Sequence, residues 1–216
     1  MPYLDKVIDL SHYQTHVDFT KVASGGFLGT LHKATEGRTG KDERCKPRRD
    51  LALMVGLLYG TYHFGTNGNI KEQIDNYLLS YVEGDLLALD MERSGKVTDT
   101  SMALDYGEAF EEAVRVKLGR TMMIYGGGDY LRDVLNPPAS SPLGRCPLWW
   151  AKYSDTAPTR LPACWKEWTF WQYTCEGTVP GITGNVDRNR FQGDEAQLRA
   201  LWTGEPVRRV MRAPVA

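Results

Sequence analysis

The chain has 216 residues, enough for one large domain or two small ones. Hydrophobic residues make up 42% of it and charged residues 25%, which is typical of a globular protein. A formal net charge of −1 gives no indication of a nucleic-acid partner. No segment is long and apolar enough to be expected to insert into a membrane.

Short apolar runs alternate with amphipathic segments along most of the chain. The pattern predicts strands at residues 6–10, 27–34, 57–64, 86–92, 121–125, 148–153, 169–173 and 185–187. It predicts helices at residues 18–24, 42–55, 70–82, 100–118 and 129–135, with a last one near 194–201.

The order of these elements predicts the fold class. The first five strands are each followed by a helix, which implies a parallel sheet with right-handed crossovers, whereas the last three follow one another through loops. We therefore expect an α/β protein with a single irregular TIM-like β/α barrel, roughly (β/α)5(β)3, with about eight strands and few helices. The barrel is expected to span residues 1–202 and to be followed by a short basic tail at 203–216.

One predicted strand ends in two carboxyl groups, Asp90 and Glu92, after the apolar residues 86–89. Residues i and i+2 of a strand share one face, so both acids would point the same way, with Met91 opposite. Adjacent carboxyl groups at the end of a buried strand are costly. Proteins tolerate them where an acid and a base act together, and glycosidic bond cleavage is the commonest such chemistry.

The other predicted strand ends also carry polar and aromatic side chains. In a barrel of this type, functional residues lie at the carboxyl ends of the strands. Flat aromatic rings with a polar tip suit the apolar faces of sugars. The residues at these ends are Asp9, Lys33, Glu36, Tyr62, Tyr125, Trp149, Tyr153, Gln172, Tyr173 and Asp187.

Short motifs at these positions follow one another in a recognisable order. They are VIDLSHYQ at 7–14, KATEG at 33–37, GTYHF at 60–64, LDME at 89–92, IY at 124–125, PLWWAKY at 147–153, FWQY at 170–173, and VD at 186–187 with NRF at 189–191. In these motifs the chain resembles the lysozymes of glycoside hydrolase family 25, the Chalaropsis-type N-acetylmuramidases that are common as bacteriophage endolysins. The resemblance covers about residues 5–202.

The resemblance implies a lysozyme that hydrolyses the β-1,4 bond between N-acetylmuramic acid and N-acetylglucosamine in peptidoglycan. Glu92 is the expected general acid, because Asp90 and a partly dry aromatic site would raise its pKa. Asp90 is the second carboxylate, and Asp9 and Asp187 complete the catalytic acidic cluster. The expected substrate-binding residues are Glu36, Lys33, Tyr62, Tyr125, Trp149, Tyr153, Gln172 and Tyr173.

The role of Asp90 stays open among three mechanisms. Cα atoms two residues apart on a strand are about 6.6 Å apart, so the carboxyl groups fit either a retaining or an inverting geometry. In the third mechanism the N-acetyl group of the substrate attacks the anomeric carbon, and Asp90 orients that amide. We favour this substrate-assisted mechanism.

We expect no cofactor and no metal. His12 and His16 have a zinc-compatible spacing, but no glutamate completes a metalloprotease motif. The four cysteines form no CxxC pair. Free thiols are the favoured state, and one disulfide among Cys146, Cys164 and Cys175 is the alternative.

Bacterial peptidoglycan is the expected partner, and nucleic acid, membrane insertion and oligomerisation are not expected. Residues 1–10 lack the apolar region of a signal peptide, so we expect synthesis in the host cytoplasm and release through a holin. Two alternatives to a muramidase are another hydrolase of N-acetylated glycans, such as a chitinase, and a non-catalytic glycan-binding barrel.

Overall fold

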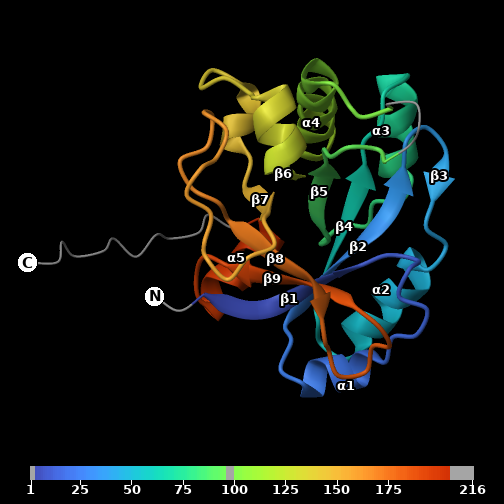
Figure 1. Cartoon of the computed structure of the whole chain (residues 1–216). Helices are drawn as coiled ribbons and strands as arrows, with labels where there is room; N and C mark the ends of the chain where they lie inside the picture. Colours follow the sequence, from blue (N-terminus) through green and yellow to red (C-terminus); the bar gives the residue numbers. More distant parts are fainter. Residues whose placement is uncertain (1–2, 96–99, 205–216) are drawn as a thin grey trace, which may run out of the picture.

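The computed structural model describes residues 3–95 and 100–204 (Figure 1). Its sheet has the strand order β1-β9-β8-β7-β6-β5-β4-β2-β3, and β1 also pairs with β2. Eight strands therefore close into a barrel, and the short β3 only extends β2. The strands are β1 (Leu4–Leu10), β2 (Gly29–Glu36), β3 (Gly40–Lys41), β4 (Leu58–Phe64), β5 (Leu86–Asp90), β6 (Met123–Gly127), β7 (Leu148–Ala151), β8 (Phe170–Gly177) and β9 (Val186–Phe191).

Few helices surround this barrel. They are α1 (Phe19–Ser24), α2 (Cys45–Met54), α3 (Ile70–Leu78), α4 (Leu104–Leu118), the π-helix η1 (Gly128–Leu135), the 3-10 helix η2 (Pro142–Arg145) and α5 (Glu195–Thr203). The predicted α/β barrel with a reduced set of helices is confirmed. The predicted basic tail lies outside the described residues from 205 onward.

The last strand departs from the parallel sheet that the strand–helix alternation implied. Parallel pairing continues from β1 through β2 and β4 to β8, but β9 is antiparallel to both β8 and β1. The reason is length, because only residues 178–185 separate β8 from β9. A parallel crossover needs about a dozen residues or more, so the chain turns back instead.

Two helix starts show how local side chains set the boundaries. Helix α5 begins with a capping box in which Asp194 and Gln197 bond to each other's backbone N–H groups. The helix expected from residue 100 begins later, at Leu104. Ser101 does not cap it, because its hydroxyl accepts a hydrogen bond of 2.9 Å from the Ser94 N–H instead.

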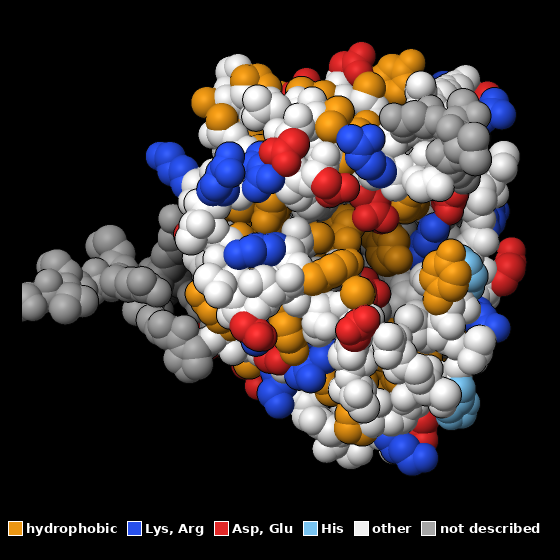
Figure 2. Space-filling view, in the orientation of Figure 1, with side chains coloured by type: hydrophobic (Ala, Val, Ile, Leu, Met, Phe, Trp, Pro, Cys, Tyr) orange, Lys and Arg blue, Asp and Glu red, His pale blue; other side chains and the backbone are white. Residues whose placement is uncertain are grey.

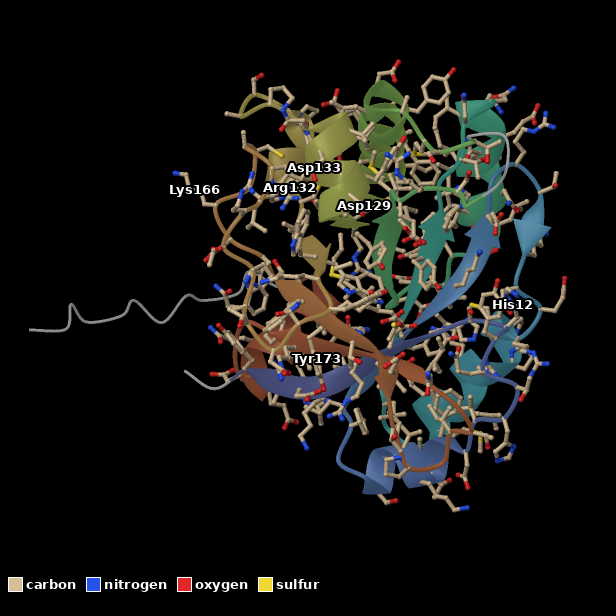
Figure 3. All side chains as sticks on the ribbon, viewed as in Figure 1. His12, Asp129, Arg132, Asp133, Lys166 and Tyr173 are labelled. Atoms are coloured by element: carbon tan, nitrogen blue, oxygen red, sulfur yellow. The ribbon has the colours of Figure 1, made fainter. Side chains whose placement is uncertain are left out.

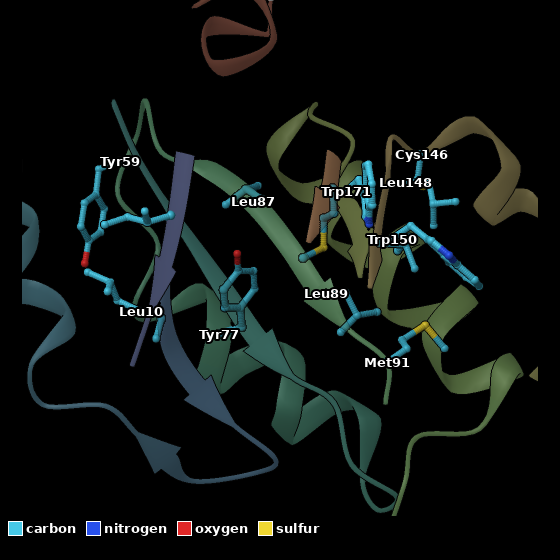
Figure 4. Packing of buried hydrophobic residues seen from close by; sticks show 14 of the residues in the cluster. Leu10, Tyr59, Tyr77, Leu87, Leu89, Met91, Cys146, Leu148, Trp150 and Trp171 are labelled. Atoms are coloured by element: carbon cyan, nitrogen blue, oxygen red, sulfur yellow. The ribbon is translucent and has the colours of Figure 1, made fainter. Parts of the chain in front are cut away.

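Side chains that alternate along the strands form two cores. Inside the barrel, Val7, Leu31, Ala88 and Phe170 pack together, and Trp202 of α5 lies against this inner cluster. Between the barrel and the helices lies the larger outer cluster, which Figure 4 shows in part. Its labelled members are Leu10, Tyr59, Tyr77, Leu87, Leu89, Met91, Cys146, Leu148, Trp150 and Trp171.

Helix α5 supports one end of the inner core. The Trp202 side chain is buried and its Nε1 donates to the Tyr59 carbonyl at 2.7 Å. Gly29 lies close beneath this indole, where a Cβ would approach it to 3.3 Å. Polar chemistry inside the barrel is therefore concentrated at the opposite end, where the strands carry acidic side chains.

Other features bear on the expected chemistry. All four cysteines are free thiols, which agrees with the favoured state. Within residues 3–95 and 100–204, none of the helices has the length and apolar character needed to cross a membrane.

Candidate active site

Acidic side chains meet at one rim of the barrel. Asp9 on β1 is the register partner of Asp187 on β9, as expected for the first and last strands of a closed barrel. Because β9 runs in the opposite direction, Asp187 reaches this rim from the start of its strand rather than from its end. Asp90 ends β5, beside Phe64 of β4 and Tyr125 of β6. Figure 2 shows acidic side chains around a hollow in the middle of this face.

Asp9 is buried and held by two amide side chains. Gln172 Nε2 donates to its two carboxyl oxygens at 3.2 and 3.1 Å, and Asn189 Nδ2 donates to Oδ2 at 2.8 Å. The same Gln172 accepts hydrogen bonds from the hydroxyls of Tyr125 and Tyr153, at 2.8 and 3.2 Å. Burial, followed by the charge of Asp187, raises the pKa of Asp9 well above its ordinary value, although the amide donors oppose the rise.

Asp90 is also buried, and its Oδ1 has no hydrogen-bond partner among the described residues. Met91, the next residue, points to the other side and lies in the outer cluster. The predicted alternation of Asp90 and Met91 is therefore present. Burial raises the pKa of Asp90 well above its ordinary value, and the neighbouring Glu92 adds to the rise. The unpaired, dry oxygen is available to a polar group of a ligand.

Glu92 lies two residues beyond the end of β5 and is half-buried. Burial raises its pKa from 4.5 to about 7, the charge of Asp129 adds to the rise, and Lys33 opposes it. Asp187 behaves similarly, since burial raises its pKa to about 6. The rim therefore holds four carboxyl groups whose pKa values are all raised, chiefly by burial.

A cleft of about 790 Å³ begins beside this acidic cluster. Lys33 and Glu36 of β2 line it and form an ion pair of 2.5 Å. The Lys33 Nζ also lies 4.7 Å from the centre of the Phe64 ring. The cleft continues along the β3 segment and past Thr66, so it offers a polar groove that leads away from the carboxyl groups.

The predicted aromatic residues divide into different environments. Tyr62 and Tyr125 each contact Trp149 inside the barrel, and their ring centres lie 6.0 and 4.7 Å from that of Trp149. Trp149 is only 1% exposed, so its ring supports the site rather than facing a ligand. Tyr153 is 58% exposed and reaches over the site to Gln172.

The structure does not bring Tyr173 to the acidic cluster. Neighbouring strand residues face opposite sides, and Gln172 takes the inner one. Tyr173 instead donates to Asp5 at 2.7 Å and packs against Trp171 and Arg190, with the arginine 4.0 Å from its ring centre. Figure 3 labels it at a distance from Asp129 of η1. We therefore remove Tyr173 from the candidate substrate-binding set.

Sequence reasoning missed two residues of the site. Asn189 donates a hydrogen bond to Asp9 and accepts one of 2.7 Å from the indole N–H of Trp149. It lies two residues after Asp187, so strand alternation would have placed it on the same face. Asp129 is the charged residue that raises the pKa of Glu92 most. It follows three glycines at the start of η1, where no periodic sequence pattern indicates its position.

His32 also has a structural role that its sequence position did not suggest. Its Nδ1 donates to the Lys33 carbonyl at 2.8 Å, and its Nε2 lies 3.1 Å from the Arg48 guanidinium. Burial lowers the pKa of His32 to about 4, so the ring is neutral and accepts from Arg48. Arg48 in turn donates to the carbonyls of Ser11, at 2.8 Å, and of Gln14, which holds the loop that follows β1.

Metal-ligand clusters are not found among the residues that the structure describes. His12, one of the two histidines at zinc-compatible spacing, lies with its Nδ1 3.5 Å from Asp42 Oδ2. The side chains that the structure brings to the rim are carboxyl groups, amides and tyrosines.

A barrel rim that brings a half-buried acid, whose pKa burial raises to about 7, together with neighbouring carboxyl groups is the arrangement that acid–base glycosidases use. The chain belongs to the glycosyl hydrolases family 25, whose sequence model matches residues 8–182. It is a glycoside hydrolase of the lysozyme and muramidase type, as predicted.

Individual relatives agree with this assignment. Lysozyme M1 of Streptomyces globisporus is 30% identical over 207 residues, which cover 90% of this chain and 70% of the relative. The N,O-diacetylmuramidase of Arthroderma benhamiae is 29% identical, over 86% and 78% of the two chains. The crystal structure of the bacterial lysozyme from Streptomyces coelicolor superposes with a TM-score of 0.84 at 28% identity, covering 92% of this chain and 97% of the other.

Proposed function

We propose that the protein cleaves the β-1,4 bond between N-acetylmuramic acid and N-acetylglucosamine in bacterial peptidoglycan, with Glu92 as the general acid. The observation that carries this proposal is the meeting of Glu92 with other carboxyl groups at one rim of the barrel, where burial raises its pKa to about 7. A carboxyl group that is still protonated near neutral pH can donate to a leaving oxygen. Relatives named as a lysozyme and as an N,O-diacetylmuramidase support the choice of substrate.

The other members of the acidic cluster have supporting roles in this proposal. Asp90 carries an unpaired buried oxygen that would accept a hydrogen bond from the substrate. Asp9 is already saturated by Gln172 and Asn189, so it orders these amides around the reacting sugar. Asp187 is its register partner and closes the ring of carboxyl groups.

Asp90 fits the substrate-assisted mechanism best. Asp90 would accept a hydrogen bond from the N–H of the N-acetyl group and so orient the amide oxygen, which attacks the anomeric carbon. The first product then keeps the β configuration. Proton NMR during early turnover of a soluble glycan fragment detects the anomer, and initial formation of the α anomer would refute this role of Asp90.

The cleft that begins at Lys33 and Glu36 would hold sugar units on one side of the scissile bond. Tyr62, Tyr125 and Tyr153 would line the reacting sugar, since each combines a ring with a hydroxyl. Tyr125 and Tyr153 already share Gln172 as a hydrogen-bond acceptor, so their hydroxyls are fixed in place.

Digestion of purified peptidoglycan tests the proposal. The wild type should release soluble fragments, and Glu92→Gln should lower the rate by about a hundredfold or more, the usual contribution of a general acid. Glu83→Gln, an exposed change of the same chemistry before β5, is the matched control and should retain full activity. Chitin oligomers in a parallel reaction distinguish a chitinase, and undiminished activity in Glu92→Gln would end the assignment.

We further propose that the enzyme serves as a phage endolysin, made in the host cytoplasm and released to the wall through a holin. Two endolysins of known structure share the fold, with TM-scores of 0.72 and 0.68, so the fold is compatible with this role. Expression inside a bacterium tests it: turbidity should fall only when a membrane-permeabilising agent or a holin is supplied. Lysis without permeabilisation would contradict the release through a holin.

A further inference from the structure

A second hollow, of about 430 Å³, shares no lining residue with the cleft or the acidic cluster. It is lined by Arg132 of η1 and by the segment between β7 and β8, which supplies Arg160 and Lys166. Figure 3 labels Arg132 and Lys166 on these neighbouring segments, and Figure 2 shows basic side chains gathered in this part of the face. We call this hollow, defined by Arg132, Arg160 and Lys166, the basic pocket.

The basic pocket carries an excess of positive charge. Arg132 is neutralised by Asp133, with hydrogen bonds of 2.6 and 2.8 Å to its two oxygens. Arg160 and Lys166 are exposed, and the charge of Arg160 acts on the same Asp133, so one carboxylate faces two arginines and the pocket keeps a positive excess. The whole chain has a formal net charge of −1, so this excess is local. Such a pocket attracts an anionic ligand.

The remaining lining is apolar and selects among anions. Trp165 is 7% exposed, and its Nε1 is anchored to the Cys146 carbonyl at 2.8 Å. Leu161 and Pro162 lie beside it in the lining. Short aliphatic side chains would contact this surface while carboxylates reach the cations. A peptide of small apolar and acidic residues suits this combination better than a strongly hydrated polyol phosphate does.

The helix η1 connects the basic pocket with the acid. Asp129, whose charge raises the pKa of Glu92, lies three residues before Arg132 on η1. Three helical residues advance by at most about 4.5 Å along the axis. An extended peptide of four residues spans about 13 Å, so a peptide attached to a sugar at Glu92 can enter the basic pocket.

We propose that the basic pocket binds the carboxylates of the peptide stem that muramic acid carries in uncleaved peptidoglycan. This inference rests on the proposed function, because the stem is attached to the sugar that would lie beside Glu92. Arg160 and Lys166 pair with stem carboxylates, and Trp165, Leu161 and Pro162 contact the alanine methyl groups. The protein therefore prefers peptide-bearing glycan to bare glycan.

The test compares two substrates and a double variant, Arg160→Gln with Lys166→Gln. Peptidoglycan freed of phosphate polymers is used either intact or after its stems have been removed by an amidase. The double variant should lower kcat/KM on the intact material by about three- to tenfold, the value of two exposed ion pairs. On the stripped glycan, whose only carboxylate is the lactyl group left on muramic acid itself, wild type and variant should agree within about twofold.

Lys46→Gln with Lys117→Gln is the matched control, since it removes the same charge from exposed positions on α2 and α4. It should leave both rates unchanged. Equal losses on both substrates, or no loss on either, would overturn the basic-pocket proposal while the muramidase proposal stands. A loss seen only when the wall retains its phosphate polymers would overturn it in favour of a phosphate ligand. Failure of the wild type to cut either glycan would refute the proposed function and this inference with it.

Discussion

Asp129→Asn tests how the fold sets the pKa of the general acid. A pKa of about 7 for Glu92, against its ordinary 4.5, corresponds to about 3 kcal/mol that disfavours the carboxylate. Burial is the largest cause and Asp129 is the next. Because Asp129 is exposed, water screens its charge, and we assign it about 0.7 kcal/mol, in the range measured for exposed pairs. Removing that charge should lower the pKa of Glu92 by about half a unit.

The variant should therefore lose activity only on the alkaline side. At pH 7 the protonated fraction of Glu92 falls from about one half to about one quarter, whereas at pH 5 it barely changes. The assay is kcat/KM against a soluble glycan fragment between pH 4 and pH 9. In Asp129→Asn, the alkaline limb of the plot of kcat/KM against pH should shift to lower pH. Added salt should shift the alkaline limb of the wild type in the same direction.

Asp133→Asn is the matched control, because it is an exposed acid on the same helix that is engaged by Arg132. It should leave the alkaline limb where the wild type has it. An unchanged limb in Asp129→Asn, or a limb that moves to higher pH, would refute the electrostatic reasoning.

Three further predictions concern stability and positioning. Glu92→Gln should raise the free energy of unfolding by up to about 3 kcal/mol at pH 8 and leave it unchanged at pH 4. The reason is that the wild type loses stability as the pH rises from 4.5 through about 7, where its buried Glu92 ionises. Equal gains at both pH values in urea titrations would contradict this prediction. Asn189→Ala removes the hydrogen bonds that Asn189 makes with Asp9 and Trp149. The value of kcat should fall about tenfold, and the free energy of unfolding should fall by about 1–3 kcal/mol. An unchanged kcat would show that Asp9 does not need this support. Arg48→Met leaves the buried carbonyls of Ser11 and Gln14 unpaired, so the free energy of unfolding should fall by about 2–4 kcal/mol. Denaturant titrations should show the same loss at every pH between 5 and 8. A loss that varies with pH would indicate that the neighbouring His32 ionises.

Alternation and barrel closure account for most of what the sequence predicted. Opposite environments for Asp90 and Met91 follow from the strand period alone. The pairing of Asp9 with Asp187 follows from joining the first strand to the last in a closed sheet. These rules require only the correct strand positions, and the predicted strands lie within a few residues of the observed ones.

What the sequence did not predict depends on contacts that no local pattern encodes. The direction of β9 is decided by the short segment before it. Tyr173 was assigned to the site from its motif, although the neighbouring Gln172 already occupies the inner face. Asp129 acts on Glu92 only because η1 folds over the rim after a run of glycines, a tertiary arrangement without a periodic signal.

The identity of the new reducing end tests the central claim most directly. Purified peptidoglycan is digested with the protein, the products are reduced with borohydride, and the reduced sugar is identified by mass spectrometry. The account predicts reduced N-acetylmuramic acid from the wild type and at least about a hundredfold less from Glu92→Gln after the same short digestion. Reduced N-acetylglucosamine would instead identify a glucosaminidase and contradict the account.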